Sequence, residues 1–366
     1  MHFYYNNLIK DVFFISQMEL NRKRVLITGI TGFIGAELAH KLLEQGYEVF
    51  GFIQPVIGRD LSCLEDIRDK IKLLICDIKD YFSVRNSIKK IEPDVVFHLA
   101  ALSPVRLSFE HPFEYQDSNF VGTVNIAESL RELYGPDKVR LIAASTAEVY
   151  GIQEKNEPFV EALRLEPSSP YAVSKASLDM YLRMIHTVYN FNVVILRNSN
   201  TFGRKYDPSF FTEYLITEML NGKDIYIGAP DSIRDYMYVD DHVSSYLLAM
   251  KTPEARGQVF NIAGGKGYTN KEWTLKIAEI LGFPLGKIHF GQYPPNYPNR
   301  PLPSDQPYLV LDSTRARTVL GWSQKIPPEE GLRKTAEYWR NKYLKEQKIG
   351  ISEQKLDKIK EIIDSE

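Results

Sequence analysis

Tyr171 and Lys175 are the two residues whose types and spacing point most directly to chemistry. They lie four positions apart in residues 168–189, a stretch with helical periodicity, so both side chains should share one helix face. An ammonium beside a phenol favours the phenolate and lowers the pKa of the phenol, as a general base requires. A tyrosine and a lysine at this spacing are more often a surface pair, so the interpretation depends on the residues brought beside them.

The strand expected at residues 139–144 ends directly before two further groups of this kind. Thr146 offers a hydroxyl and Glu148 a carboxylate at the carboxyl edge of the predicted sheet, where ligands bind in such folds. The structural alternative for Glu148 is a carboxylate at a helix start or in an ion pair. The sequence therefore predicts a catalytic set of Thr146, Glu148, Tyr171 and Lys175.

A glycine-rich turn follows the strand expected at residues 25–28. Its glycines are spaced G-x-x-G-x-x-G, and the next segment, residues 33–45, has helical periodicity. Such glycines permit a tight turn and let backbone N–H groups approach a pyrophosphate at a helix N-terminus. The strand–turn–helix context disfavours an ordinary glycine turn. We predict that a dinucleotide cofactor binds at Gly29, Thr31, Gly32, Phe33, Ile34 and Gly35.

The adenosine end of the cofactor is less clearly marked. The second strand ends in residues 51–55 (GFIQP), without the carboxylate that binds a ribose 2′-hydroxyl or the arginines that bind a 2′-phosphate. Arg59 follows and is either a phosphate contact or an ordinary surface residue. The lack of an acid tilts the prediction toward NADP, with NAD as the alternative. Asp77, with Ile78, is a candidate for the adenine amino group, and a helix N-cap is its competing role.

Short runs rich in β-branched residues alternate with helix-length segments, among them residues 33–45, 113–133 and 168–189. Continuous apolar runs between helices are typical of parallel strands that are buried on both faces. The sequence therefore predicts an α/β fold with a doubly wound parallel sheet, a Rossmann fold, and a smaller C-terminal α/β substrate domain. The expected strands are residues 25–28, 49–53, 73–76, 95–99, 139–144, 193–196 and 259–262.

The composition excludes several classes of protein. Among 366 residues, 45 lysines and arginines face 47 aspartates and glutamates, a net charge of −2, which gives no reason to expect nucleic acid or an anionic membrane as partner. No apolar run approaches the ~20 residues needed to span a bilayer. The two cysteines, Cys63 and Cys76, support neither a disulfide scaffold nor a cysteine metal site. We predict a cytoplasmic protein that binds no metal.

These features together resemble the extended short-chain dehydrogenases/reductases that modify nucleotide sugars. The match covers roughly residues 23–340 and keeps its motifs in order. The matching motifs are residues 29–35, 98–101 (HLAA), 119–123 (NFVGT), 145–151 (STAEVYG), 171 with 175, 197–203 (RNSNTFG), 234–241 (RDYMYVDD) and 320–322 (LGW).

The resemblance implies a catalytic cycle on a nucleotide sugar. Tyr171 would take the proton of the sugar 4-hydroxyl as a bound NAD(P) accepts the C4 hydride. Lys175 would hold the nicotinamide ribose, and Thr146 would bond the 4-oxygen. The position of Glu148 distinguishes the subfamilies: it is the C5 base in 4,6-dehydratases, also a glutamate in UDP-glucuronate decarboxylases, and usually small or hydroxylic in 4-epimerases.

The segments around these residues look most like GDP-mannose 4,6-dehydratases, namely residues 108–112, 153–154 and 157–159. We therefore predict an enzyme that converts an NDP-hexose, GDP-mannose favoured, to its 4-keto-6-deoxy derivative. A 4-epimerase of the UDP-glucose type and a UDP-glucuronate decarboxylase are the enzymatic alternatives. A non-enzymatic cofactor-binding regulator is disfavoured, because such a protein would be expected to lose Tyr171 or Lys175.

Two departures leave the nucleotide and the sugar open. Ala147 replaces the aspartate that expels the C6 hydroxyl in dTDP-glucose dehydratases, so Glu148, or a water that it orients, would serve both roles. Residues 200–214 also lack the arginine-rich segment of GDP-mannose dehydratases, of which Arg204 and Lys205 remain. From Arg234 onward the chain reads more like epimerases and decarboxylases.

The same resemblance assigns further contacts and an organisation. It implies a homodimer, with a tetramer as the alternative, paired through the helices at residues 113–133 and 168–189. We predict an extension at 1–20, a cofactor domain at 21–198 plus 235–262, a nucleotide-sugar domain at 199–234 plus 263–345, and a charged helical tail at 346–366. The cofactor contacts implied are Leu99, Ala100 and Ala101, and the substrate contacts are Ser103, Asn200, Arg234 and Arg300.

Overall fold

The structure is a computed structural model that describes residues 23–56, 60–293 and 305–363, with side chains up to residue 345. The predicted extension at residues 1–20 and the candidate residues Arg59 and Arg300 lie outside the described residues.

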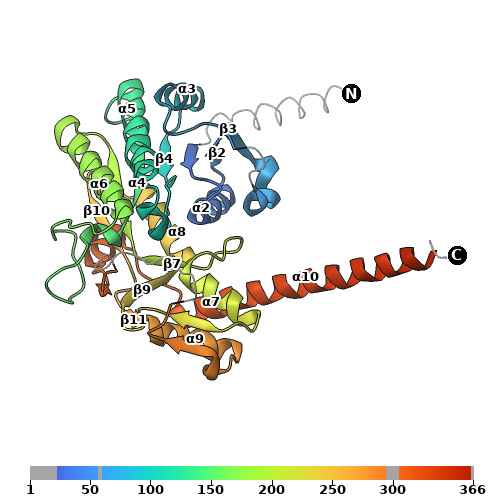
Figure 1. The fold of residues 1–366 in the computed structure, drawn as a ribbon. Coiled ribbons are helices and arrows are strands. Elements are labelled where there is room, and N and C mark those ends of the chain that lie inside the picture. The colour runs from blue at the N-terminus through green and yellow to red at the C-terminus, as the bar shows by residue number, and fades with distance from the viewer. Residues whose placement is uncertain (1–22, 57–59, 294–304, 364–366) are drawn as a thin grey trace, which may run out of the picture.

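A parallel sheet forms the centre of the molecule (Figure 1). In the described residues it has seven strands in the order β10-β6-β5-β4-β1-β2-β3, and the chain reverses its direction of travel across the sheet between β1 and β4. Each strand overlaps the apolar run that predicted it. The strands are β1 (Arg24–Thr28), β2 (Glu48–Ile53), β3 (Ile71–Ile75), β4 (Val95–His98), β5 (Arg140–Thr146), β6 (Val193–Asn198) and β10 (Val259–Ile262).

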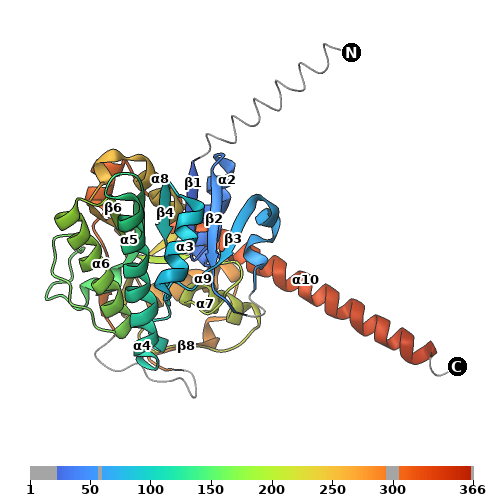
Figure 2. The ribbon, with the colours of Figure 1, turned by 90° about the horizontal axis from the view of Figure 1, so that it is seen from above.

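Helices cover both faces of this sheet (Figure 2). On one face α2 (Phe33–Glu44) packs beside α8 (Val239–Lys251), and on the other α3 (Tyr81–Ile91), α5 (Gly122–Tyr134) and α6 (Pro170–Tyr189) lie in a row. Alternate side chains of a strand point to opposite faces. Accordingly, Val25 and Ile27 belong to one buried cluster and Leu26 to the other. The predicted doubly wound parallel sheet is confirmed.

The segment predicted as one helix at residues 113–133 changes its winding in the middle. It consists of α4 (Pro112–Tyr115), the π-helical turn η3 (Gln116–Val121) and α5. Asn119 in this turn is fully buried, and its side-chain amide bonds both the N–H and the carbonyl of Leu102. The wider turn therefore places an amide against the loop that leaves β4.

Smaller sheets lie beside the central one, at the carboxyl ends of its strands. Strand β9 (Ile233–Tyr238) pairs with β7 (Asn200–Phe202), β11 (Gly267–Thr269) and β13 (Tyr308–Leu309), while β8 (Ile225–Ile227) pairs with β12 (Ile288–Phe290). The helices of this region are α7 (Phe211–Leu220), α9 (Asn270–Leu281) and α10 (Pro328–Ile363). Leu332 and Trp339 are buried near the start of α10, and its remainder projects away from the body (Figure 1).

Short 3-10 and π turns complete the fold. They are η1 (Ser62–Lys70), η2 (Arg106–Phe109), η4 (Ala147–Tyr150), η5 (Pro253–Ala255), η6 (Leu285–Lys287) and η7 (Ala316–Leu320).

A buried ion pair ties the catalytic edge of the sheet together. Arg197 on β6 and Asp179 on α6 are both fully buried. Two hydrogen bonds, of 2.8 and 2.9 Å, join the guanidinium of Arg197 to the carboxylate of Asp179. Arg197 also donates to the hydroxyl of Tyr150 at 2.8 Å, and that hydroxyl donates to Asn261 on β10. Losing one partner of such a pair leaves an uncompensated buried charge. The network thereby fixes the η4 turn, which carries Glu148, against α6, which carries Tyr171.

Candidate active site

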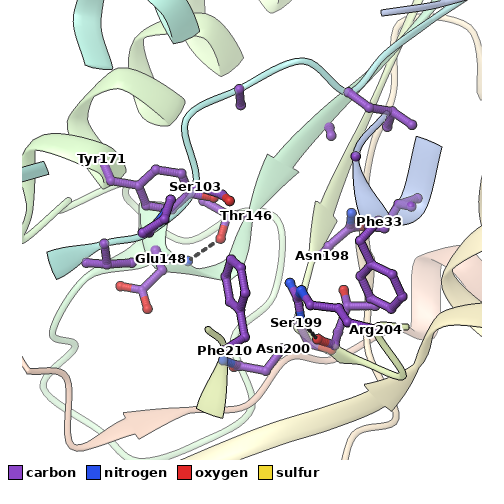
Figure 3. A pocket seen from close by; sticks show the side chains of 18 of the residues that line it. Phe33, Ser103, Thr146, Glu148, Tyr171, Asn198, Ser199, Asn200, Arg204 and Phe210 are labelled. Carbon is purple, nitrogen blue, oxygen red and sulfur yellow. Dashed lines mark hydrogen bonds between the residues drawn. The ribbon is translucent and has the colours of Figure 1, made fainter. Parts of the chain in front are cut away.

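A cavity of about 530 Å³ opens at the carboxyl ends of β1, β4, β5 and β6 (Figure 3). This is the place where the strand order reverses, at which open α/β sheets bind ligands. Its walls combine the glycine loop, the end of β5, α6 and the segment after β6. The predicted site residues that line it are Gly29, Gly32, Phe33, Ile34, Gly35, Leu99, Ala101, Ser103, Thr146, Glu148, Tyr171, Lys175 and Asn200.

The glycine loop has the geometry that a phosphate cradle needs. Gly29 has φ +74°, and a Cβ there would lie 2.7 Å from the backbone nitrogen of Ala100. A Cβ on Gly35 would lie 2.2 Å from the carbonyl oxygen of Gly29. Helix α2 begins after Gly32 with no side-chain cap and no acidic residue in its first turn. The positive end of the helix is therefore available to an anion.

A buried polar chain connects this loop with α6. His98 lies 2.7 Å from the Thr28 hydroxyl through Nδ1 and 2.8 Å from the Thr123 hydroxyl through Nε2. Because Thr123 donates its own proton to the Asn119 carbonyl, Nε2 of His98 must be the donor. Burial lowers the pKa of His98 to about 3, which keeps the ring neutral. The chain continues from Asn119 to Ser174, which donates to the Tyr171 carbonyl.

Tyr171 and Lys175 lie together on the buried face of α6, as their spacing predicts. Tyr171 is 8% exposed, and burial raises the pKa of its phenol well above the ordinary value, an effect that a hydrogen bond with Thr146 partly offsets. Lys175 donates to the Ala144 carbonyl at 2.8 Å, and burial lowers its pKa to about 8. In the chain itself burial therefore outweighs the lowering of this pKa that the sequence predicts, and the net shift of the phenol is upward.

Glu148 lies on the same side of the cavity as Tyr171 and Thr146 (Figure 3). Its backbone N–H donates to Thr146 Oγ1, which caps the η4 turn. Its carboxylate Oε2 accepts a hydrogen bond from Gln306 at 3.0 Å. A hydroxyl, a phenol and a carboxylate therefore converge on one wall, which suits proton transfer to and from neighbouring atoms of a ligand.

Arg204 is a candidate anion-binding residue that the sequence did not single out for this role. Its guanidinium lies 3.5 Å from the ring centre of Phe210 and 4.6 Å from that of Phe33, and it donates to the Thr201 carbonyl (Figure 3). The Arg204 side chain is 13% exposed, and a charge with so little access to water is expected to have a partner. The carboxylate of Glu213, 3.6 Å away, is one. The only signal in the sequence was a basic residue directly after the turn at Gly203.

The remaining predicted contacts lie apart from the cavity wall. Arg234 bonds Asp305 at 2.9 Å and, within the described residues, is absent from the lining. The Asp77 carboxylate accepts the backbone N–H of Lys79, and Ile78 is buried against α5; neither lines the cavity in the described residues. Ala100 is the residue against which Gly29 packs.

The lining of the cavity has the chemistry that a nicotinamide dinucleotide and a second polar ligand require. Two serine hydroxyls in its wall, Ser145 and Ser199, are buried and have no hydrogen-bond partner among the described residues. Such orphaned groups are expected where a polar ligand supplies the partner. With the glycine cradle on one side and the Tyr171–Lys175 pair on the other, fold and site define a dinucleotide-dependent enzyme of the Rossmann class.

The comparisons with known proteins agree with this class. A family model described as GDP-mannose 4,6 dehydratase matches residues 26–335. The chain is 34% identical to UDP-glucose 4-epimerase of Mycolicibacterium smegmatis, with 87% of this chain and 99% of that protein covered. It is 29% identical to a probable dTDP-glucose 4,6-dehydratase of Sinorhizobium fredii, with 86% and 92% covered.

A solved structure extends the likeness to three dimensions. UDP-glucose 4-epimerase of Thermotoga maritima, in complex with UDP-glucose, superposes with a TM-score of 0.78 at 30% identity, covering 87% of this chain and 99% of that one. The chain therefore belongs to the NAD-dependent epimerase/dehydratase family of nucleotide-sugar-modifying enzymes, as its motifs predict.

Within the described residues, no helix is both long and apolar enough to cross a membrane. The same part of the chain holds no cluster of three or more His, Cys, Asp or Glu side chains arranged to bind a metal ion.

Proposed function

We propose that the chain is a nucleotide-sugar 4,6-dehydratase, which converts an NDP-hexose, with GDP-mannose favoured, into the NDP-4-keto-6-deoxy sugar. The observation that carries the proposal is the Glu148 carboxylate, which lines the same cavity as Tyr171 and Thr146. An epimerisation at C4 needs one acid–base group at the 4-oxygen. A dehydration also needs a base for the C5 proton, and Glu148 supplies it.

The first half of the reaction uses α6 and the end of β5. Tyr171 takes the proton of the 4-hydroxyl, and the Thr146 hydroxyl bonds the 4-oxygen and orients it. A nicotinamide dinucleotide held by the glycine loop and Lys175 would supply the acceptor, and later the donor, of the C4 hydride. Lys175 sits one helix turn beyond Tyr171 and holds the nicotinamide ribose.

The second half of the reaction uses Glu148. The 4-ketone acidifies the C5 proton, which Glu148 accepts as its C–H bond breaks. The C6–O bond then breaks, and the proton held by Glu148 leaves with the hydroxyl as water, which accounts for the alanine at position 147. Return of the hydride to C6 and of a proton to C5 completes the 4-keto-6-deoxy sugar.

A 4-epimerase is the second candidate, because the Mycolicibacterium and Thermotoga relatives carry that name. A UDP-glucuronate decarboxylase is the third. Mass spectrometry of separate incubations with GDP-mannose, UDP-glucose, dTDP-glucose and UDP-glucuronate distinguishes them. Loss of one water from a hexose substrate supports the proposal; a new isomer of unchanged mass, or loss of carbon dioxide, contradicts it.

We propose that the cofactor is NAD, although the sequence alone favours NADP. A second cavity, of about 580 Å³, adjoins the glycine loop at Thr31 and Gly32. Each basic side chain in its wall has an acidic partner, since Lys205 pairs with Glu37, His40 with Asp66 and Arg204 with Glu213. A 2′-phosphate that entered this cavity would meet the repulsion of the carboxylates in its wall, which are Glu37, Asp60, Glu65, Asp66 and Asp207.

Cofactor preference is directly measurable. We expect the dissociation constant for NAD to be at least about tenfold below that for NADP, the ratio that ~1.4 kcal/mol of repulsion produces. Titration of the enzyme with each dinucleotide by calorimetry checks this. Tighter binding of NADP would instead support the NADP preference that the sequence predicts.

We also propose a homodimer formed through α6 and its neighbour α5. Four apolar side chains repeat along the outer face of α6 at helical spacing and are well exposed; they are Val173, Met180, Met184 and Val188. An exposed apolar stripe of this kind is typical of a helix that packs against a partner.

Replacing Met180 by glutamate should dissociate this dimer, because a charge would be buried at the centre of the stripe. Leu285→Glu, at an equally exposed apolar residue of η6, is the matched control and should leave the assembly intact. Sedimentation velocity at micromolar concentration reads out both. A dimer that survives Met180→Glu unchanged would rule out this surface; a tetramer that falls to a dimer would identify it as one of two interfaces.

The predicted domain boundaries and the cytoplasmic location stay predictions. The thiols of Cys63 and Cys76 are free, in keeping with a reducing compartment.

A further inference from the structure

Gln306 is a fully buried glutamine that contacts the proposed C5 base. Its side-chain nitrogen lies 3.0 Å from Oε2 of Glu148 and 3.3 Å from the Glu148 carbonyl. The same nitrogen lies 3.3 Å from the hydroxyl of Ser168, which immediately precedes the N-cap of α6. Gln306 therefore joins the η4 turn to the start of the helix that carries Tyr171.

The chemistry of this contact suits a base. A donor directed at one carboxylate oxygen favours the ionised form and fixes the rotation of the group. A lysine or arginine in the same place would also hold the carboxylate, but its charge would make the carboxylate a poor proton acceptor. A neutral amide orients Glu148 and leaves it basic.

The backbone around Gln306 is held on both sides. The preceding residue, Asp305, pairs with Arg234 at 2.9 Å, and the carbonyl of Pro307 accepts the N–H of Ile233. Strand β13 then pairs with β9. A residue that orients another side chain does so most precisely from a rigid backbone segment of this kind.

Packing alone does not account for a glutamine here. The side-chain oxygen of Gln306 is buried with no hydrogen-bond partner among the described residues. Leaving a buried acceptor unpaired costs stability, and an apolar side chain of similar size would avoid that cost. The contacts of this amide that the described structure shows are those of its nitrogen, with Glu148 and Ser168.

We propose that Gln306 is a positioning residue that orients the Glu148 carboxylate and keeps it ionised for removal of the C5 proton. Within the described residues Gln306 is not part of the cavity wall, so it acts through Glu148. This inference rests on the proposed dehydratase function.

The test compares Gln306→Leu and Gln306→Glu with a matched control, Gln153→Leu. Gln153 is a partly buried glutamine of the same region whose side-chain nitrogen, in the described part of the chain, donates to the backbone carbonyls of Tyr150 and Arg164. We expect Gln306→Leu to slow dehydration about 10- to 100-fold, the range for losing a hydrogen bond to a charged group, with an unchanged KM. In the kcat–pH profile of Gln306→Leu, the acidic limb should shift to a pH about one unit higher than in the wild type. The shift should be larger in Gln306→Glu, because a second carboxylate opposes ionisation of Glu148.

A partial reaction separates positioning from folding. Reduced cofactor should form at the wild-type rate in Gln306→Leu, while uptake of solvent deuterium at C5 slows with the overall reaction. Gln306→Asn, whose shorter amide can still donate, should recover part of the rate. A pH profile and a C5 exchange rate equal to the wild type, or an equal loss of both half-reactions, would overturn the proposal.

Different results would contradict the role of Gln306 and the dehydratase function. If Glu148→Gln itself leaves the reaction unaffected, the dehydratase mechanism is wrong. If Glu148→Gln stalls after C4 oxidation while Gln306→Leu behaves as the wild type, only the role of Gln306 is wrong.

Discussion

Tyr171→Phe should abolish turnover while leaving the dinucleotide bound with wild-type affinity. The substitution removes the hydroxyl that takes the 4-hydroxyl proton and keeps the ring, which packs edge-on against Tyr115 with centroids 6.3 Å apart. General acid–base groups contribute about 10²- to 10⁴-fold, so kcat should fall by a factor in that range. Product formation and cofactor titration measure the two effects separately.

The control for this variant is Tyr134→Phe. This substitution also removes a tyrosine hydroxyl, one that donates to the backbone carbonyl of Ile88. Tyr134 lies at the end of α5, away from the cavity. Its activity should equal that of the wild type. Full activity of Tyr171→Phe would contradict any mechanism that begins with oxidation at C4 by this phenol.

Glu148→Gln should stall the enzyme after the first half-reaction. The amide cannot accept the C5 proton, so the 4-keto sugar and the reduced cofactor should accumulate while elimination slows about 10²- to 10⁴-fold. The absorbance of the reduced nicotinamide follows this accumulation directly.

Glu166→Gln provides the same change of charge on the loop after η4. Glu166 is an exposed partner of Arg164 and does not line the cavity in the described structure. It should show neither accumulation nor slowing. If Glu148→Gln has no effect on turnover, then Glu148 is not a base, and epimerisation becomes the better account.

The sequence predicted the parts of this molecule that depend on local signals. Apolar runs located the strands, and the glycine spacing located the cradle, because each of these constraints acts within one turn or one strand. The four-residue spacing placed Tyr171 and Lys175 on one buried face of α6. Ordered motifs were enough to identify the family.

What the sequence missed depends on contacts between distant residues. Gln306 and Glu148 are 158 positions apart in the sequence but bond each other in the fold, and no motif near either residue predicts this contact. Nothing in the sequence indicates that the guanidinium of Arg234, the predicted substrate contact, pairs with Asp305, 71 positions away. The raised pKa of Tyr171 follows from burial of the whole site, so a rule about one neighbouring lysine could not anticipate it.

The most direct test of the central claim is the mass of the product formed by the wild-type enzyme in deuterium oxide. The mechanism removes the C5 proton, expels water, returns the original C4 hydride to C6 and reprotonates C5 from solvent. It therefore predicts a hexose product that has lost one water and carries one deuterium at C5. A product isomeric with the substrate and free of deuterium would show that Glu148 removes no proton, and would contradict the account.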